Sequence, residues 1–288
     1  MPLKKRCEGV FLRKLPGFRK IFPYLMPTRT ESTIYYGQRV RLEETLAWLA
    51  KFNAGREKKI SVFHIVLAAS ARTLALRPEA NRFVSGRRIY QRKTIDLSFI
   101  IKRELTEDAG ETNLKLTFDP RATVADVVDR VAAAVKTTRS SEVSSDEKLT
   151  DLLTRGPRWV TRLATGAFRL LDYFNSLPAS FVRGDAFVSS AYLANLGSIG
   201  LDAVFHHMFE FGNTPFFIVV GKPKRVPVVN EAGAIVAADV LDMNISLDER
   251  VNDGVHYAKT IALLTDLIEH PGKLESAPES LPDPFRHV

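Results

Sequence analysis

The fold is decided by residues 246–254, which read Ser246-Leu247-Asp248-Glu249-Arg250-Val251-Asn252-Asp253-Gly254. Leading into this stretch, apolar Leu241, Met243, Ile245 and Leu247 alternate with polar Asp242, Asn244, Ser246 and Asp248, which predicts a half-buried strand. After it, apolar residues from Val255 to Glu269 recur at helical spacing. The stretch is therefore predicted to be a polar turn between a strand and a helix, a place where side chains can converge on a ligand. The alternative is that Asp248, Arg250 and Asp253 pair with one another and cap the helix.

This turn resembles D-H-R-x-x-D-G, the signature of the acyltransferase catalytic domain of 2-oxo acid dehydrogenase complexes. It also resembles H-H-x-x-x-D-G of chloramphenicol acetyltransferase, which shares that fold. Asp248, Arg250, Asp253 and Gly254 match the signature. The position of the family's catalytic histidine holds Glu249, so the resemblance covers the scaffold of the turn but not its reactive group.

Three further stretches resemble the same family in the same order. Residues 60–83 resemble its second-helix region, residues 194–200 (A-N-L-G-S-I-G) its T-x-S-N-L-G-x-x-G, and residues 215–221 (P-F-F-I-V-V-G) its apolar strand ending in glycine. The resemblance implies a two-layer α/β sandwich of the chloramphenicol acetyltransferase type, with a mixed sheet and helices on one face. We expect the acyltransferase-like domain to span residues 31–275, followed by a loose tail at 276–288.

In that family an acyl group passes between a thiol and an acceptor inside a tunnel between subunits. The histidine removes the proton of the attacking group, a serine of S-N-L-G stabilises the oxyanion, and the aspartate holds the loop by an ion pair. Carried over, the base position is Glu249, the oxyanion position is Ala194 and the structural aspartate is Asp253. The resemblance also implies coenzyme A or a related thioester as acyl donor, a small acyl acceptor, and a homotrimer or higher homo-oligomer.

Both chemical positions are changed. A glutamate with a pKa near 4.3 is poorly matched to a thiol near 8.5 unless burial raises it. The side chain of Ala194 cannot donate a hydrogen bond, and losing one oxyanion donor costs about 10²–10³ in rate. The backbone, Asn195 or Ser198 are the alternative donors at this position.

A relocated base is the first alternative for proton transfer. His206 and His207 lie between the N-L-G turn and the apolar strand, where family topology brings them near the tunnel, and Glu249 or Glu210 can pair with them. The competing interpretation is that both histidines pack in an interface or a core. Two histidines with Glu249 do not make a convincing metal site, so no metal is expected.

The formal net charge of +8 is concentrated at the N-terminus. Residues 1–30 hold eight basic residues and one acidic residue, interleaved with apolar side chains. They are predicted to form a basic amphipathic arm that contacts an acidic partner or an anionic membrane surface, or a first helix that packs on the body. The nearly neutral remainder gives no support for nucleic-acid binding.

The remaining composition indicates a globular chain of 288 residues, 45% hydrophobic, without a membrane-spanning run. A single cysteine, Cys7, excludes an internal disulfide framework, and the N-terminus is a poor signal peptide, so a cytoplasmic location is expected, with peripheral membrane attachment as a variant. The arm is too short for a lipoyl-bearing or subunit-binding domain, so a stand-alone form is expected.

Residues 147–176 form a helical block that is larger than the family domain usually needs here. Helices are predicted at 147–154 and 157–176, the second with a wide apolar face that includes Trp159, Leu163 and Leu170. This face could cover the core, pack between subunits or lie on a membrane.

Two functions remain open: a coenzyme A-dependent acyltransferase with a rearranged centre, and a non-catalytic trimeric scaffold that kept the fold and lost the chemistry.

Overall fold

The structure, a computed structural model, describes residues 6–102, 111–140, 155–230 and 232–288. Its longer helices are α1 (Gly17–Leu25), α2 (Glu43–Phe52), α3 (Val62–Leu76), α4 (Val124–Ser140), α6 (Arg158–Tyr173), α7 (Ala179–Gly184) and α8 (Gly254–Glu269). Its strands are β1 (Gly9–Phe11), β2 (Thr33–Arg41), β3 (Arg82–Ser85), β4 (Arg88–Arg92), β5 (Ile95–Lys102), β6 (Glu111–Phe118), β7 (Ala191–Asn195), β8 (Phe216–Val220), β9 (Lys224–Val229) and β10 (Ile235–Asp248).

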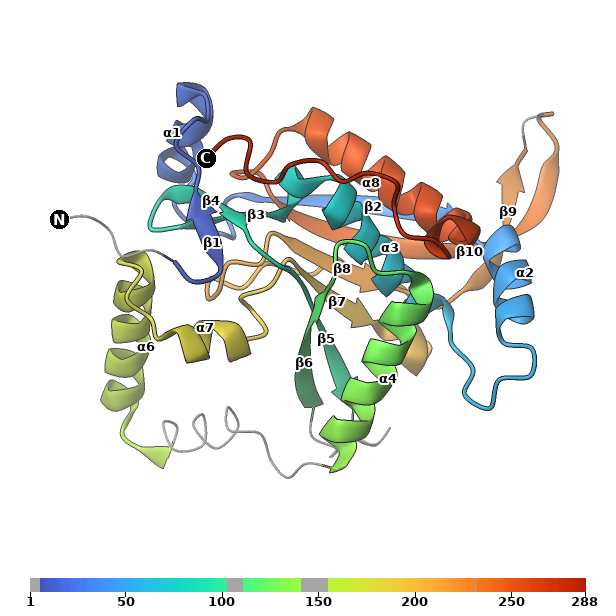
Figure 1. Ribbon diagram of the computed structural model, residues 1–288, viewed down its shortest axis with the longest axis horizontal. Coiled ribbons are helices and arrows are strands. Elements are labelled where there is room, and N and C mark those ends of the chain that lie inside the picture. Colours follow the sequence, from blue (N-terminus) through green and yellow to red (C-terminus); the bar gives the residue numbers. More distant parts are fainter. Residues whose placement is uncertain (1–5, 103–110, 141–154, 231) are drawn as a thin grey trace.

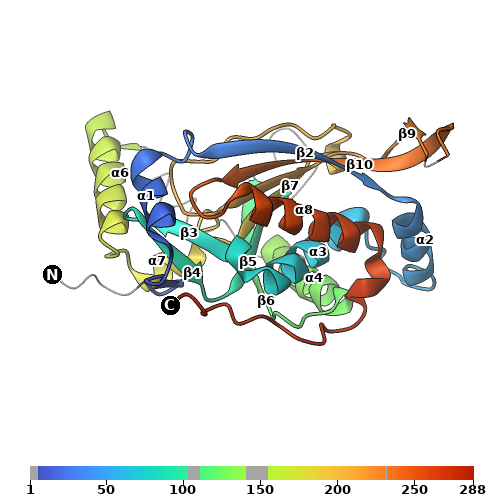
Figure 2. The same ribbon diagram turned by 90° about the horizontal axis from the view of Figure 1, so that it is seen from above.

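The main sheet is mixed and has the order β2-β10-β8-β7-β5-β6, with β9 paired to one end of β10. The strands β5, β7 and β8 run parallel to one another, and the other pairs are antiparallel. The helices α3, α4 and α8 lie together on one face of this sheet (Figures 1 and 2). The predicted α/β class with a mixed sheet and a helical layer is confirmed.

Strand β10 is the centre of this arrangement because it pairs with β2, β8 and β9. Its alternation is the one predicted from sequence. Met243, Ile245 and Leu247 are at most 2% exposed and pack in the core beneath the helices. On the opposite face Asn244 Nδ2 donates to the carbonyl of Ala203 at 3.0 Å, and Ser246 Oγ donates to that of His206. The polar side chains of β10 therefore hold residues 201–209 across the face that the helices leave free.

A second, three-stranded sheet has the order β1-β4-β3. It brings the N-terminus onto the body, since β1 pairs with β4 and Arg6 is 5% exposed in contact with Glu8, Ser85 and Asp172. Helix α1 lies at the same end of the molecule as α6 (Figure 2). Residues 276–288 run back along the body, and Arg286 pairs there with Glu79.

Two elements differ from the sequence-based expectation. The apolar pattern of residues 187–193 predicts a strand, but β7 begins only at Ala191. Before it, Ser190 N donates to the carbonyl of Asp96 on β5, and the carbonyl of Phe187 accepts from the backbone N of Asn213 and Thr214. Helix α6 forms as predicted, yet none of its residues is buried, and Trp159 and Leu163 are 68% and 69% exposed. Its apolar face therefore does not cover the core of this chain. The predicted helix at 147–154 lies outside the described residues.

The hairpin between β3 and β4 turns at Ser85-Gly86-Arg87-Arg88. Gly86 and Arg87 have φ of 54° and 59°, the pattern of a type I′ turn, in which glycine and asparagine are favoured. Arg87 is thus held in a backbone region that costs an ordinary residue about 1–2 kcal/mol.

We expect Arg87→Gly to raise the free energy of unfolding by about 1 kcal/mol, because it removes this left-handed strain. Urea denaturation followed by circular dichroism measures the change. The matched control is Arg88→Gly in the adjoining strand, which should lower stability, since glycine costs about 0.5–1 kcal/mol in a strand interior. Equal destabilisation by both variants would show that the Arg87 side chain outweighs the strain.

Candidate functional site

The turn after β10 is built on a buried carboxylate with two arginine partners. Asp248 is 1% exposed and accepts from Arg250 Nε at 2.8 Å and from the second terminal nitrogen at 2.8 Å. Arg29 NH1 lies 3.8 Å from the same carboxylate. Asp248 and Arg250 of the turn therefore pair with each other, and Arg29 from the segment before β2 joins them.

The charges of this cluster are set by burial and pairing together. Burial opposes ionisation of Asp248, but hydrogen bonds and charge from Arg250, with the charge of Arg29, outweigh it and lower the pKa of Asp248. Burial lowers the pKa of Arg29 against the attraction of Asp248. Tyr257 donates its hydroxyl to the carbonyl of Asp248, and burial raises its pKa. The cluster is therefore an ionised, fully enclosed support for the turn.

Asp253 caps helix α8. Its Oδ1 accepts from the backbone N of His256 at 2.9 Å and lies 2.8 Å from His256 Nδ1, while Oδ2 pairs with Arg19 of α1 at 2.8 Å. Burial of Asp253 opposes its charge, but these hydrogen bonds outweigh it and lower the pKa of the carboxyl well below its usual range. Gly254 is the first residue of α8. Asp253 thus joins α1, the turn and α8.

Glu249 lies between these two structural carboxylates and is half-buried. Its backbone N donates to the carbonyl of Ser32 at 2.9 Å, which fixes the turn against the start of β2. Its carboxylate forms no hydrogen bond or ion pair with any residue that the structure describes. It is the one acidic side chain of the turn that structural pairing does not use.

The second motif forms the end of β7. The Asn195 Oδ1 accepts from the backbone N of Ser198 at 3.3 Å, and Ser198 Oγ donates to the carbonyl of Asn195 at 2.7 Å. A Cβ at Gly197 would lie 2.5 Å from the carbonyl oxygen of Gly221, so glycine is required there. The hydroxyl of Ser198 is therefore already hydrogen-bonded within the turn. The Asn195 amide nitrogen keeps its hydrogens unused among the described residues.

His206 and His207 have defined tautomers. The Nδ1 of His206 lies 2.7 Å from the carbonyl of His207, and the Nδ1 of His207 lies 3.2 Å from the carbonyl of Met208. A carbonyl can only accept, so each Nδ1 carries the hydrogen, and Nε2 is the ring nitrogen that can accept a proton. The His206 ring stacks on Phe217 at a centroid distance of 4.1 Å and an interplanar angle of 3°.

The sheet register separates the two positions carried over from the family. Ala194 pairs with Val219 and Val219 with Asn244, so these three residues lie level across the sheet. Glu249 follows Asn244 by five residues, which corresponds to about 16 Å along the strand direction. His206 is nearer to Ala194, because it stacks on Phe217, whose neighbour on β7 is Tyr192. Within one chain, therefore, Ala194 and Glu249 do not meet, whereas His206 and Ala194 share a region of the sheet.

The structure places neither histidine in an ion pair with Glu210 or Glu249 among the described residues. Glu210 accepts instead from the backbone N and hydroxyl of Thr30, at 2.8 and 2.6 Å. The described part of the chain also contains no group of three or more His, Cys, Asp or Glu side chains arranged to hold a metal ion. No described helix is both long and apolar enough to cross a membrane.

Three residues of this region are not predicted as site residues from the sequence: Arg19, Arg29 and His256. The D-x-x-H spacing at the start of a helix is a readable signal for His256, since residue N3 is where a capping aspartate finds its partner. Arg29 carried no such signal. It belongs to the basic stretch 1–30, yet it is 7% exposed and donates its Nε to the carbonyl of Phe209 at 2.6 Å.

Comparison with known proteins identifies the fold. Residues 186–275 match the model of the family described as 2-oxoacid dehydrogenases acyltransferase (catalytic domain). The structure resembles the cubic core of the pyruvate dehydrogenase multienzyme complex with a TM-score of 0.60 and 16% identity, over 90% of this chain and 88% of that one. The fold is that of the 2-oxoacid dehydrogenase acyltransferases. The resemblance predicted from the sequence is confirmed.

Two other solved structures show the same acyltransferase fold. The dihydrolipoamide acetyltransferase of Azotobacter vinelandii gives a TM-score of 0.60 at 16% identity, over 84% of this chain and 83% of that one. Chloramphenicol acetyltransferase gives 0.55 at 12% identity, over 90% and 99%. No curated protein sequence matches the chain.

Proposed function

We propose that this acyltransferase-fold protein transfers an acyl group from a coenzyme A or dihydrolipoyl thioester, with His206 as general base. The observation that carries the proposal is the His206 tautomer. Its Nδ1–H is held by the carbonyl of His207 at 2.7 Å, which leaves Nε2 ready to accept a proton from an attacking thiol or hydroxyl. The ring is fixed by stacking on Phe217, so this acceptor is pre-oriented.

The oxyanion donor that we propose is the side-chain amide of Asn195. Ala194 has no donor, and Ser198 is used inside the turn. The Asn195 Oδ1 accepts from the backbone N of Ser198, which orients the free amide N–H groups away from the turn. Preorganised donors of this kind are the largest single contribution to many acyl transfers.

Glu249 is proposed to act from a neighbouring subunit of a homo-oligomer, with a trimer as the expected state. It lies about 16 Å along the strands from Ala194 in its own chain, so only a second copy can bring it to the thioester. The similar structures that are cores of 2-oxoacid dehydrogenase complexes support such an assembly. In that setting the carboxylate of Glu249 would orient the acceptor or stabilise the protonated imidazole.

A non-catalytic scaffold is the second candidate. The replacement of the oxyanion serine by Ala194 and of the histidine by Glu249 favours it, because the residues of the turn that remain, Asp248 and Asp253, have structural partners. A scaffold needs Asp248 and Asp253 for stability, but its function does not depend on the tautomer of His206.

The test is consumption of acetyl-coenzyme A by the full chain in the presence of thiol, hydroxyl and amine acceptors, followed by chromatographic separation of coenzyme A. Acceptor-dependent release above the uncatalysed rate supports the acyltransferase. No release with any acceptor class, from a protein that forms a stable homo-oligomer in light scattering, supports the scaffold.

A further inference from the structure

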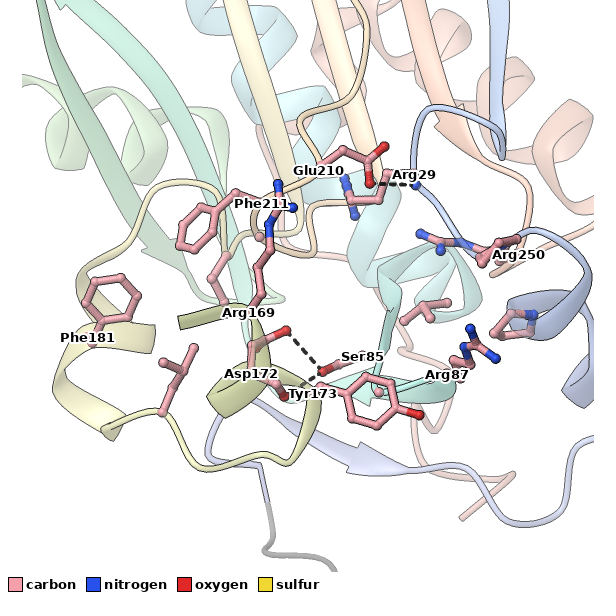
Figure 3. Close-up of a pocket in the computed structure, with 17 residues that line it drawn as sticks. Arg29, Ser85, Arg87, Arg169, Asp172, Tyr173, Phe181, Glu210, Phe211 and Arg250 are labelled. Carbon is pink, nitrogen blue, oxygen red and sulfur yellow. Dashed lines mark hydrogen bonds between the residues drawn. The ribbon is translucent and has the colours of Figure 1, made fainter. Parts of the chain in front are cut away.

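A cavity of about 310 Å³ lies behind the turn that carries Arg250. It is enclosed by the segment before β2, the β3–β4 hairpin, the α6–α7 block and residues 210–212 (Figure 3). Ala194, Glu249, His206 and His207 do not line it. It is therefore separate from the groups proposed for acyl transfer, and the inference drawn from it goes beyond that function.

Four arginines line the cavity against two carboxylates. The arginines are Arg29, Arg87, Arg169 and Arg250, and the carboxylates are Asp172 and Glu210. Both carboxylates are already engaged. Asp172 pairs with Arg6 at 2.9 Å, and Glu210 accepts from the backbone N of Thr30 at 2.8 Å. The cavity thus has more positive charge than its own acidic groups can balance.

Arg29 contributes a buried donor without an acceptor. Its Nε and one terminal nitrogen donate to the carbonyls of Phe209 and Thr214. Its NH1 has no hydrogen-bond partner and lies 3.8 Å from Asp248, beyond hydrogen-bond distance. Arg29 is only 7% exposed, and buried donors of native proteins almost always have a partner. The guanidinium of Arg29 therefore adds a buried, incompletely hydrogen-bonded cation to the wall of the cavity.

Arg87 and Arg169 bring two further cations to the rim. Neither forms an ion pair with a carboxylate in the part of the chain that the structure describes. Arg169 extends from α6 across the cavity toward Glu210 and Phe211, while Arg87 and Arg250 approach from the opposite side (Figure 3). Arg87 faces the ring of Tyr24 at 5.6 Å and is held in the left-handed conformation described above. Guanidinium groups converging from several elements suit the oxygens of a phosphate or carboxylate.

Apolar side chains supply the rest of the wall. They include Val84, Tyr173, Phe181 and Phe211. A volume near 310 Å³ is at the small end of ligand sites, which combine apolar walls with a few charged groups that fix orientation. Inorganic phosphate alone would leave these walls without contacts.

We infer that this cavity binds a small organic anion. Its oxyanion head group, a phosphate or a carboxylate, lies beside Arg29 and Arg169, and its apolar body packs against Phe181 and Phe211. Because Arg250 and Arg29 also hold Asp248, a ligand here contacts the residues that support the D-E-R turn.

The experiment is isothermal titration of the full chain with phenyl phosphate, phenylacetate and the uncharged benzyl alcohol at low ionic strength. Arg169→Gln is the test variant, because Arg169 is exposed on α6 and its loss leaves the fold intact. The matched control is Arg162→Gln on the same helix, which does not line the cavity.

We expect saturable binding of at least one charged compound, none of benzyl alcohol, and a decrease in affinity as salt rises. Arg169→Gln should weaken binding about 10-fold or more, the range of a charge-assisted hydrogen bond, and Arg162→Gln less than about 2-fold. The tighter of the two charged compounds identifies the head group. Absence of saturable binding of both charged compounds at 10 mM, or equal weakening by both variants, overturns the inference. Acetyl-coenzyme A turnover by Arg169→Gln should equal that of the wild type, so failure here is distinguishable from failure of the proposed function.

Discussion

Replacing Asp248 by asparagine is expected to lower the free energy of unfolding by about 3–5 kcal/mol, the cost of removing one partner from a buried ion pair. Asp248 is 1% exposed, and the variant keeps its shape while leaving the guanidinium groups of Arg250 and Arg29 enclosed without their counter-charge. Urea denaturation followed by circular dichroism gives the difference. Because asparagine has nearly the same shape as aspartate, the loss of stability reports the missing charge and not a packing defect.

Asp242 on the same strand provides the matched control. Its carboxylate pairs with Arg39 at 2.7 Å and Lys224 at 2.9 Å, but both partners are partly exposed. Asp242→Asn should cost less than about 1 kcal/mol, because water screens such pairs. Similar losses for both variants would contradict the view that burial makes the Asp248 cluster special.

The same cluster predicts a pH dependence. The pKa of Asp248 is lowered in the folded state, by Arg250 and Arg29 acting against burial. Its contribution to stability is therefore fully present above the unfolded value near 3.9 and is lost as pH falls through the folded pKa. Stability of the wild type should decrease below about pH 4, and that of Asp248→Asn should decrease less steeply.

Alternation and turn chemistry predicted the centre of the fold correctly. The polar and apolar faces of β10, the turn after it and the start of α8 follow from the period of the side chains and from the N-cap Asp253, all of which are local properties. The structural pairing of Asp248 with Arg250 was one of two alternatives that the sequence left open. Both residues are near in sequence, so their contact needs no tertiary information.

Contacts between distant segments could not be predicted in this way. Arg29 lies 219 residues from Asp248 in sequence, and nothing in its surroundings distinguishes a buried cation from a solvated one. The separation of Ala194 from Glu249 is likewise a consequence of strand register, because Ala194 lies level with Asn244, five residues before Glu249. The exposure of the apolar face of α6 depends on where the chain places the helix, not on its pattern.

Replacing His206 by alanine is expected to reduce acyl transfer from acetyl-coenzyme A by about 10²–10⁴-fold, the usual contribution of a positioned general base. The reason is the loss of the fixed Nε2 acceptor, for which Glu210 is no substitute because it is bonded to Thr30. The assay is the chromatographic release of coenzyme A described above. Circular dichroism and light scattering check that the variant keeps its fold and assembly.

His207→Ala and Glu249→Gln are the comparisons for this loss. The His207 ring is more exposed and its Nδ1 contact is longer, at 3.2 Å, so we expect less than about a 10-fold effect. Glu249→Gln keeps the shape and removes the charge that a neighbouring subunit is proposed to supply. Turnover by His206→Ala within about 2-fold of the wild type, or a larger loss in Glu249→Gln than in His206→Ala, would show that His206 is not the general base.

Calorimetric titration of the wild type and of His206→Ala/His207→Ala with coenzyme A and acetyl-coenzyme A tests the central claim, that this fold still recognises a thioester, most directly. We expect saturable binding to the wild type in the micromolar range, and we expect the double variant to bind but not to turn over. No binding to the wild type at millimolar ligand would contradict it and leave the scaffold as the function of this fold.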